Sequence, residues 1–512
     1  MIREFNQNVY LLVLSFISFN AYALPFSIYP KSGTSLPTQV LPGEAVSAFY
    51  TITNNTGSLR NNNYIKYLPP NVTQITFNRY FPDLCGSTFN LQPNGKAGDS
   101  CTLELSITGV VNANDPIPQH HLFACFPGGA TCAGTNFPLN VTLVENALVA
   151  VGSYSINAAS LPGIATSAQG LTWNQQTLPL PTNIIRAFLI GVTSSGPTCV
   201  AVGEYVSNTN DVPGVALSTD SGNTWSQQVL TPPSGFSNGY LSGINCNNHI
   251  CNAVGVYTNS TQQFGVARSL DNGGSWSLQA LPLLSPYISG QLIGVNCSGN
   301  NCVGVGSYRD NSFLNHAAIA YSLDAGTNWS QITLPLLSGI RDAFLIGASC
   351  SGTFCVAVGE YDTNTGNQLP GIAVSVNGGI SWSQTTLTLP SPYIDGTLTG
   401  ISCNSNKCVA VGGYSQPGGS NVPINPAIAV TTNGGVTWSQ QVLTSLPAGF
   451  ISGTLNGIEC SANTCIAVGN YTSSSFVDTA AVVTSTDGGN TWSQQTLALP
   501  AGITRSELIG IS

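Results

Sequence analysis

The sequence predicts an all-β protein in which an N-terminal β-sandwich precedes a seven-bladed β-propeller closed by the C-terminal strand. Three observations lead to this fold class. Gly and Pro number 55 and 30 among 512 residues, and no long segment has the periodicity of a helix. Residues 24–143 alternate apolar and polar side chains without a repeat. Residues 146–512 repeat one unit of four short strands.

Residues 1–23 have the pattern of a secretory signal peptide. Arg3 precedes the apolar run 10–19, and a small-x-small cleavage site ends at Ala23. This run is shorter than the roughly 20 residues that a membrane-spanning helix needs. We expect cleavage after Ala23, export to a secreted, periplasmic or cell-surface location, and no transmembrane segment.

Residues 24–143 are expected to form the β-sandwich. The stretch AVSAFYTITNN from Ala45 has the period of two that is typical of a half-buried strand. Through this strand the segment loosely resembles the immunoglobulin-like modules of bacterial secreted proteins. Its four cysteines allow three connectivities, of which the pairs closest in sequence are Cys85 with Cys101 and Cys125 with Cys132.

Two adjacent histidines in this module indicate either a metal site or a solvated loop. His120 and His121 are adjacent, but the nearest carboxylate is the distant Asp115. A metal site needs several ligands at close spacing, so the solvated loop is favoured. No metal and no cofactor are expected anywhere in the chain.

Charged residues make up 6% of the chain and the net charge is -9, against about a quarter in ordinary globular proteins. Nucleic acids and anionic membranes require clustered Lys and Arg, which this sequence lacks. We therefore expect a monomer whose partner is a protein or a glycan.

The repeated unit is marked by the motif S-x-D-x-G-x-x-W. It contains all seven Trp of the chain, spaced 51 to 56 residues apart: Trp173, Trp225, Trp276, Trp329, Trp382, Trp438 and Trp492. Each unit predicts four strands, which we call A to D; in one unit they are 345–350, 355–361, 371–375 and 381–387. Four strands at this period are typical of a propeller blade.

The two ends of the repeat region each carry part of one unit. The first unit begins at strand B, with ALVAVGSY from Ala147, and the chain ends with a lone strand A, residues 508–512. We expect these two segments to pair, because that completes a seventh blade and removes the exposed edges of an open array.

The Asp of the motif is interpreted as a turn cap. It occurs as Asp220, Asp271, Asp324 and Asp487, and it is replaced by Asn377 and Asn433. An amide keeps the hydrogen-bond acceptor and loses the charge, which suits a turn better than a metal ligand or a general acid. The motif resembles the Asp-box, or BNR, repeat of bacterial sialidases and of the photosystem assembly factor family, over residues 146–512. That resemblance implies a structural turn remote from the active face.

Five units carry C-x4-C between strands A and B. A tight hairpin would place these cysteines at disulfide distance, giving the pairs Cys246/Cys251, Cys297/Cys302, Cys350/Cys355, Cys403/Cys408 and Cys460/Cys465. A zinc site would need two pairs to converge, yet each pair belongs to a different blade. Ser194 replaces the first cysteine of one unit, so Cys199 is expected to be a free, buried thiol.

The strand order predicts two different ends for the blades. The A–B and C–D turns share one end, with the cysteines and Asp-boxes, whereas the longer and irregular B–C and D–A loops share the other. A Tyr closes strand B in every unit and is interpreted as packing between blades, with sugar stacking as the alternative. The unrepeated charges at the loop end are the candidate binding residues, against the alternative of a solvated rim: Arg186, Glu204, Arg309, Arg341, Asp342, Glu360 and Arg505.

Two functions follow from this arrangement. The resemblance to sialidases implies a glycoside hydrolase, which would need three Arg, a Tyr activated by a Glu, and an acidic Asp. Arg186, Arg341 and Arg505 recur just before strand A, and Glu204 and Glu360 are the only Glu at matching positions. The Arg-Ile-Pro segment that accompanies a sialidase site is absent. The sequence therefore favours a non-catalytic binding or scaffold protein, with a sialidase-like hydrolase as the alternative.

Overall fold

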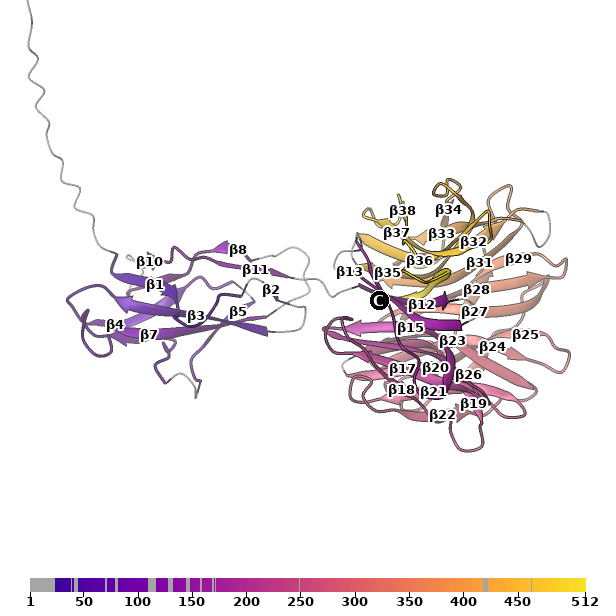
Figure 1. The fold of residues 1–512 in the computed structure, drawn as a ribbon, viewed down its shortest axis with the longest axis horizontal. Coiled ribbons are helices and arrows are strands. Elements are labelled where there is room, and N and C mark those ends of the chain that lie inside the picture. Colours follow the sequence, from indigo (N-terminus) through magenta and orange to yellow (C-terminus); the bar gives the residue numbers. More distant parts are fainter. Residues whose placement is uncertain are drawn as a thin grey trace, which may run out of the picture. The chain divides into compact units, whose positions relative to one another are not determined.

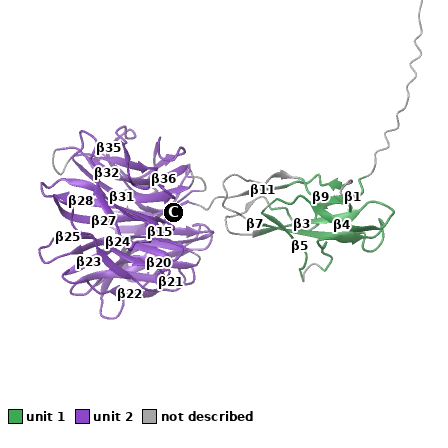
Figure 2. Ribbon diagram, turned by 180° about the vertical axis from the view of Figure 1, so that it is seen from behind, with its two compact units in different colours: residues 1–144 green, residues 145–512 purple. Residues whose placement is uncertain are grey.

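The computed structural model describes residues 24–512, except positions 38, 41–44, 70, 79–81, 109–116, 128–131, 144–147, 157–158, 168–169, 171, 248, 418–421 and 462. The predicted signal peptide and Asp115 lie outside the described residues. The chain forms two compact units, residues 1–144 and 145–512 (Figure 2). Every regular element in the described part of the chain is a β-strand, so the all-β prediction is confirmed (Figure 1).

The described residues of the first unit form three sheets. Their strand orders are β1(Phe26–Pro30)-β3(Ala45–Asn54)-β7(Ser100–Thr108)-β5(Val72–Ile75), β10(Cys132–Gly134)-β9(Phe123–Cys125)-β4(Arg60–Lys66)-β6(Phe89–Leu91) and β2(Gln39–Val40)-β11(Leu139–Leu143)-β8(Ile117–His120). In β3 the alternate residues Ala48, Tyr50 and Ile52 are buried in the core, as the period of two requires. Disulfides join Cys85 to Cys101 and Cys125 to Cys132, the pairs closest in sequence.

The second unit contains seven four-stranded antiparallel sheets among its described residues. We number them sheets 1 to 7 and name their strands A to D. Sheet 1 is β39(Arg505–Ile511), β12(Leu148–Ile156), β13(Ala159–Ser167), β14(Asn174–Thr177); sheet 2 is β15(Ile184–Ser195), β16(Thr198–Ser207), β17(Asp211–Ser218), β18(Ser226–Val229); sheet 3 is β19(Asn238–Asn247), β20(Ile250–Thr258), β21(Gln262–Ser269), β22(Ser277–Leu281). Sheet 4 is β23(Ser289–Ser298), β24(Asn301–Arg309), β25(Asn315–Ser322), β26(Ser330–Thr333); sheet 5 is β27(Ile340–Ser351), β28(Phe354–Thr363), β29(Gln368–Ser375), β30(Ser383–Thr386). Sheet 6 is β31(Asp395–Asn404), β32(Lys407–Ser415), β33(Ile424–Thr431), β34(Ser439–Val442); sheet 7 is β35(Phe450–Ser461), β36(Thr464–Ser473), β37(Asp478–Ser485), β38(Ser493–Thr496).

Sheet 1 combines the two ends of the repeat region. Its strand A is β39, which pairs antiparallel with β12 from Ala150 opposite Ile511 to Ser155 opposite Arg505. Leu508 is fully buried in the core that β12 and sheet 7 share. Strands from the two ends of the repeat therefore form one sheet with one core.

The A strands lie against one another around a cavity of about 200 Å³, which is lined by three residues from each of the seven A strands. The middle residue of every triplet is Gly. A Cβ at Gly191 of sheet 2 would lie 2.8 Å from the carbonyl oxygen of Ser242 in sheet 3, and one at Gly510 would lie 2.7 Å from that of Ile190. Only glycine permits this approach between neighbouring strands.

A Tyr at the end of each B strand is fully buried: Tyr154, Tyr205, Tyr257, Tyr308, Tyr361, Tyr414 and Tyr471. In six sheets its hydroxyl donates to a Gln of strand D, as from Tyr205 to Gln227 at 2.8 Å. Sheet 3 has Leu278 in place of that Gln, and the Tyr257 hydroxyl lies 3.5 Å from the carbonyl of Val266 instead. Complete burial leaves these rings as packing groups, so they cannot stack on a sugar.

Candidate functional site

We call the turn that contains the S-x-D-x-G-x-x-W motif the Asp-box. Its carboxylate accepts hydrogen bonds from residues of the same turn. Asp220 accepts hydrogen bonds from the Thr224 amide at 2.8 Å, from the Thr224 hydroxyl at 2.6 Å and from the Ser218 hydroxyl at 2.8 Å. These bonds, those from Thr224 foremost, lower the pKa of Asp220 to about 2. The Trp225 indole donates to the Gly222 carbonyl at 2.9 Å, so the ring is fixed on the turn.

The Asn copies keep the same turn. Asn377 accepts from the Ser381 amide at 3.0 Å, and its own amide nitrogen donates to the Ser381 hydroxyl at 2.8 Å. Only the direction of one hydrogen bond changes, because an amide is both acceptor and donor. The box of sheet 1 is one residue shorter: Ser167 pairs with Leu148 where Ser218 pairs with Cys199.

The Asp-boxes and the A–B turns contact each other within sheets 2 to 7. The Ser221 amide donates to the Pro197 carbonyl at 2.8 Å, and the equivalent bond occurs in sheets 3 to 7, from Asn272, Ala325, Gly378, Gly434 and Gly488. The disulfides at this end are Cys246–Cys251, Cys297–Cys302, Cys350–Cys355, Cys403–Cys408 and Cys460–Cys465. Hydrogen bonds and disulfides thus occupy this end in nearly every sheet, which marks it as scaffold.

The opposite end of the cavity differs from sheet to sheet. Two positions before the first cavity residue, each A strand carries a half-buried side chain: Phe188, Tyr240, Gln291, Phe344, Thr397, Thr454 or Glu507. We call these seven the mouth residues. Because every A strand runs from the loop end towards the Asp-box end, they lie where the cavity meets the loop end.

A second row lies beside the mouth residues, on the B strands, one residue before each buried Tyr: Ser153, Glu204, Val256, Ser307, Glu360, Gly413 and Asn470. The two rows are in contact. The Ser153 hydroxyl donates to Glu507 at 2.9 Å, and the Thr397 hydroxyl donates to Glu360 of the preceding sheet. The mouth therefore combines aromatic rings, hydroxyls and carboxylates in one layer.

Glu360 lies in a polar cluster with Gln368, Thr397 and Asp362. It accepts a hydrogen bond from the Gln368 side chain at 2.6 Å, and Asp362 lies beside it. Burial raises the pKa of Glu360 above its usual range, and the Thr397 hydroxyl acts in the opposite direction. Burial also raises the pKa of Asp362, although Arg341 approaches that carboxylate at 3.7 Å. This pair of carboxyls favours holding a proton.

Glu204 occupies the same place in sheet 2. Burial and the charge of Asp211 raise its pKa, while Arg186 acts to lower it. The neighbouring Tyr240 has its own pKa raised, mainly by burial and then by the charge of Glu204. A phenol in this setting stays protonated at neutral pH, which is the reverse of an activated nucleophile.

The three arginines do not occupy equivalent places. Arg186 pairs with Val206 and Arg505 with Ser155, but in sheet 5 that position belongs to Asp342, which pairs with Asp362. Arg341 is offset by one residue. Their expected recurrence before strand A is therefore corrected: all three lie within strand A, in two different registers.

Asp342 has a structural role that the sequence did not indicate. It accepts hydrogen bonds from the backbone and side chain of Asn315 in sheet 4, at 2.8 and 3.0 Å, and from Arg341 at 2.7 Å. Asp395 and Asn238 accept the equivalent backbone bonds in two other sheets. A contact repeated in this way fastens neighbouring sheets, so Asp342 is held as part of the frame.

Two of the candidate arginines line small polar cavities at equivalent junctions between sheets. Arg309 lines one of about 130 Å³ with Gln262, Ser289, Gly290, Gln291, Ser307 and Asn315. Arg505 lines one of about 220 Å³ with Ser153, Ser155, Ser160, Phe188, Asp478, Ser506 and Glu507. Arg309 also lies over the Phe313 ring at 5.0 Å, which fixes its side chain.

The remaining predicted groups are Cys199 of the second unit and the histidines of the first. Cys199 is free and buried, and burial raises its pKa to about 12, so it is unsuited to act as a nucleophile. His121 contacts the Thr135 carbonyl at 2.9 Å. Across the described ranges, no group of three or more His, Cys, Asp or Glu could hold a metal ion. The same residues include no helix with the length and apolarity to cross a membrane.

Unrepeated charges predict Glu204 and Glu360, which lie beside the mouth residues, but they indicate none of the seven mouth residues themselves, such as Phe188, Tyr240 and Phe344. The signal that identifies them is variation: the residue before the Leu of strand A reads Phe, Tyr, Gln, Phe, Thr, Thr and Glu from unit to unit, while its neighbours repeat. A position that varies inside a repeated strand is not required by the frame.

No known family's pattern matches this sequence, and no curated protein matches it. Solved structures of similar fold include a Trypanosoma rangeli sialidase complex with 2,3-difluorosialic acid, at 12% identity and TM-score 0.42, covering 60% of this chain and 55% of that one. A protein of unknown function from Dyadobacter fermentans has 14% identity and TM-score 0.37, covering 61% and 90%. The Bacillus subtilis arabinanase Arb43A has 7% identity and TM-score 0.30, covering 47% and 91%. This chain thus spans about half the length of the sialidase, and the likeness to all three is one of fold.

Proposed function

We propose that this chain is an exported, non-catalytic binding protein that recognises a glycan through its mouth residues. The observation that carries the proposal is the layer of half-buried side chains at the loop end, in which Phe188, Tyr240 and Phe344 lie among polar groups. A sugar presents apolar faces to aromatic rings and hydroxyl edges to amides, hydroxyls and carboxylates. If no glycan is retained in the test below, a protein partner is favoured instead.

The proposal includes a frame for this site. We infer that the seven sheets are the blades of a closed seven-bladed propeller. Support comes from the pairing of β39 with β12 and from the single cavity lined by all seven A strands. We also propose that residues 24–143 form an immunoglobulin-like sandwich after a signal peptide of residues 1–23. Seven disulfides favour an oxidising compartment outside the cytosol.

A glycoside hydrolase is the second candidate, and one observation favours it. Glu360 and Asp362 form a carboxyl pair in which burial raises both pKa values, the property that a general acid needs. Against it, the Tyr240 pKa is raised and the three arginines lie in different registers. These features support binding over a sialidase-like reaction.

The test is an array of immobilised glycans probed with the oxidised protein. We expect the wild type to retain a defined set of glycans, and Phe188→Ala and Phe344→Ala to weaken that binding about tenfold each, since each removes one stacking ring. Phe476→Ala is the matched control, because Phe476 is an exposed ring at the tip of a B–C loop, outside the mouth. Equal losses in all three variants would contradict the proposed site.

The same glycans, offered in solution, decide between the two candidate functions. The binding proposal expects them to be recovered intact after prolonged incubation. Release of reducing sugar by the wild type, abolished by Glu360→Gln, would instead establish the hydrolase. Glu360→Gln keeps the size of the side chain, its amide oxygen can still accept from Gln368, and its amide nitrogen can donate to the Thr397 hydroxyl, so loss of turnover would reflect the acid itself.

A further inference from the structure

The five disulfides of the repeat have different neighbours in the preceding sheet. The residue that follows the second cysteine position in strand B of that sheet is, in order, Val200, Asn252, Val303, Val356 and Val409. Each valine lies in the same core cluster as the disulfide of the next sheet, whereas Asn252 contacts the two sulfur atoms of Cys297 and Cys302. Loop length and local fold are the same in all five, so the chain provides its own controls.

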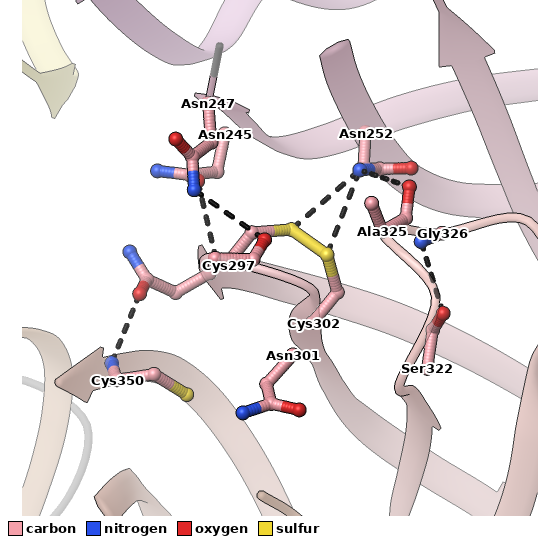
Figure 3. The surroundings of a disulfide bond; sticks show 12 residues. Asn245, Asn247, Asn252, Cys297, Asn301, Cys302, Ser322, Ala325, Gly326 and Cys350 are labelled. Carbon is pink, nitrogen blue, oxygen red and sulfur yellow. Dashed lines mark hydrogen bonds between the residues drawn. A yellow bond between two sulfur atoms is a disulfide. The ribbon is translucent and has the colours of Figure 1, made fainter. Parts of the chain in front are cut away.

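Asn252 is placed to donate to the disulfide of sheet 4 (Figure 3). Its amide nitrogen lies 3.6 Å from both the Cys297 and the Cys302 sulfur, and 3.3 Å from the carbonyl of Ala325 in the Asp-box. The side chain is 3% exposed. Its amide oxygen is buried and has no hydrogen-bond partner among the described residues.

As a packing group, Asn252 lowers the stability of the fold compared with a valine. A buried amide oxygen without a partner costs about 1 to 3 kcal/mol, whereas the valines of the other sheets bury no polar atom. The Arg268 side chain already donates to the same Ala325 carbonyl, at 3.1 Å. What Asn252 alone adds to sheet 4 is a donor aimed at two sulfur atoms.

We propose that Cys297–Cys302 is a site of thiol–disulfide exchange, opened by a dithiol reductant before any other disulfide of the repeat. The reductant's thiolate attacks the Cys297 sulfur, which is half-buried, and the S–S bond breaks. Cys302, which is fully buried, leaves as a thiolate and accepts the Asn252 hydrogen bond. The second thiol of the reductant then displaces Cys297 and closes its own disulfide. Two protein thiols and one oxidised dithiol are the products.

The asparagine acts on the leaving group. A thiolate in an apolar environment is unfavourable, and valine offers it nothing, whereas an amide donor stabilises the charge as it develops. Hydrogen bonds to charged groups are about twice as strong as neutral ones. We expect Cys297–Cys302 to be cleaved roughly tenfold faster than disulfides that face valine, the effect of one such bond.

The experiment follows each disulfide separately. The full-length oxidised protein is incubated with dithiothreitol under native conditions, samples are alkylated at intervals, and peptide mass spectrometry reports the reduced fraction of each pair. Cys246–Cys251, Cys403–Cys408 and Cys460–Cys465 are the comparators, because the first cysteine of each is half-buried like Cys297. The same reaction in urea shows what the flanking sequence contributes, and there the four rates are expected to be similar.

Two variants test the cause. Asn252→Val gives sheet 4 the residue of the other sheets and should bring the Cys297–Cys302 rate down to that of the comparators. Val409→Asn should raise the rate of Cys460–Cys465; if that variant does not fold, Val356→Asn serves the same purpose for Cys403–Cys408. Native rates that are equal in the wild type, or a Cys297–Cys302 rate unchanged in Asn252→Val, would overturn the proposal.

Discussion

The two ends of the seven sheets follow opposite rules. At the Asp-box end the same hydrogen bonds recur from sheet to sheet, such as the Trp indole bond to a Gly carbonyl in all seven. At the loop end, the mouth position is aromatic in three sheets, an amide or hydroxyl in three and a carboxylate in one. A structural frame is built from contacts that recur in every sheet, whereas a binding surface needs side chains that differ from sheet to sheet. The comparison therefore separates residues that hold the fold from residues that are free to bind.

The strongest challenge to the frame is removal of residues 508–512. Leu508 is fully buried and Ile511 is 8% exposed, and both pack against strands of sheets 1 and 7. Deletion would leave β12 with an open edge and empty part of the core, so we expect the second unit to lose its cooperative thermal transition. Ser512→Ala is the control: it removes only the two hydrogen bonds that the Ser512 hydroxyl makes with the Ser194 amide and the Ser194 hydroxyl. An unchanged melting temperature after the deletion would contradict closure by β39.

Matched truncations of one aromatic ring at each end sharpen the comparison. Trp225→Ala removes a ring that packs in the core between sheets 1 and 2 and is fixed on its Asp-box. It should lower the free energy of unfolding by about 3 kcal/mol. Phe344→Ala at the mouth should lower it by about 1 kcal/mol or less, because the ring is only partly buried. Urea unfolding measures both, and a larger loss from Phe344→Ala would make the mouth part of the frame.

The difference between the two ends also explains which features could be predicted from the sequence and which could not. The repeat revealed the strand pattern, the disulfide pairs and the turn role of the Asp-box, because each of these recurs and its exceptions are conservative, as in Asn377 and Asn433. Inter-sheet contacts were not visible in the same way. Asp342 was selected as an unrepeated charge, yet Asp395 and Asn238 perform its task with different residue types. Because different residue types make this contact between sheets, it can be recognised only from the contacts of neighbouring sheets in the structure.

Low pH should destabilise the protein through the Asp-box end. Hydrogen bonds from the turn lower the pKa of Asp220, Asp271 and Asp324 to about 2, and that of Asp487 further. The unfolded chain, whose Asp pKa is about 3.9, binds more protons in this range, so stability is present above pH 4 and falls as the pH drops towards about 2. We expect the melting temperature to decline across that window. Changing all four to Asn should flatten the decline, since Asn377 and Asn433 show that the turn tolerates the amide; an equal slope in this variant would assign acid sensitivity elsewhere.

The smallest expected change in melting temperature concerns Glu360 at the loop end. Its pH dependence is opposite to that of the Asp-box carboxylates. Burial raises the pKa of Glu360, so the folded protein holds a proton that the unfolded chain releases as the pH rises above the usual Glu value of about 4.3. Glu360 therefore costs stability at neutral pH, and Glu360→Gln should raise the melting temperature slightly at pH 7 but not at pH 4. A residue beside the mouth that destabilises the fold is retained for another reason, which is the expectation for a binding group. A lower melting temperature for Glu360→Gln at pH 7 would instead place Glu360 with Asp342 among the residues that hold the sheets together.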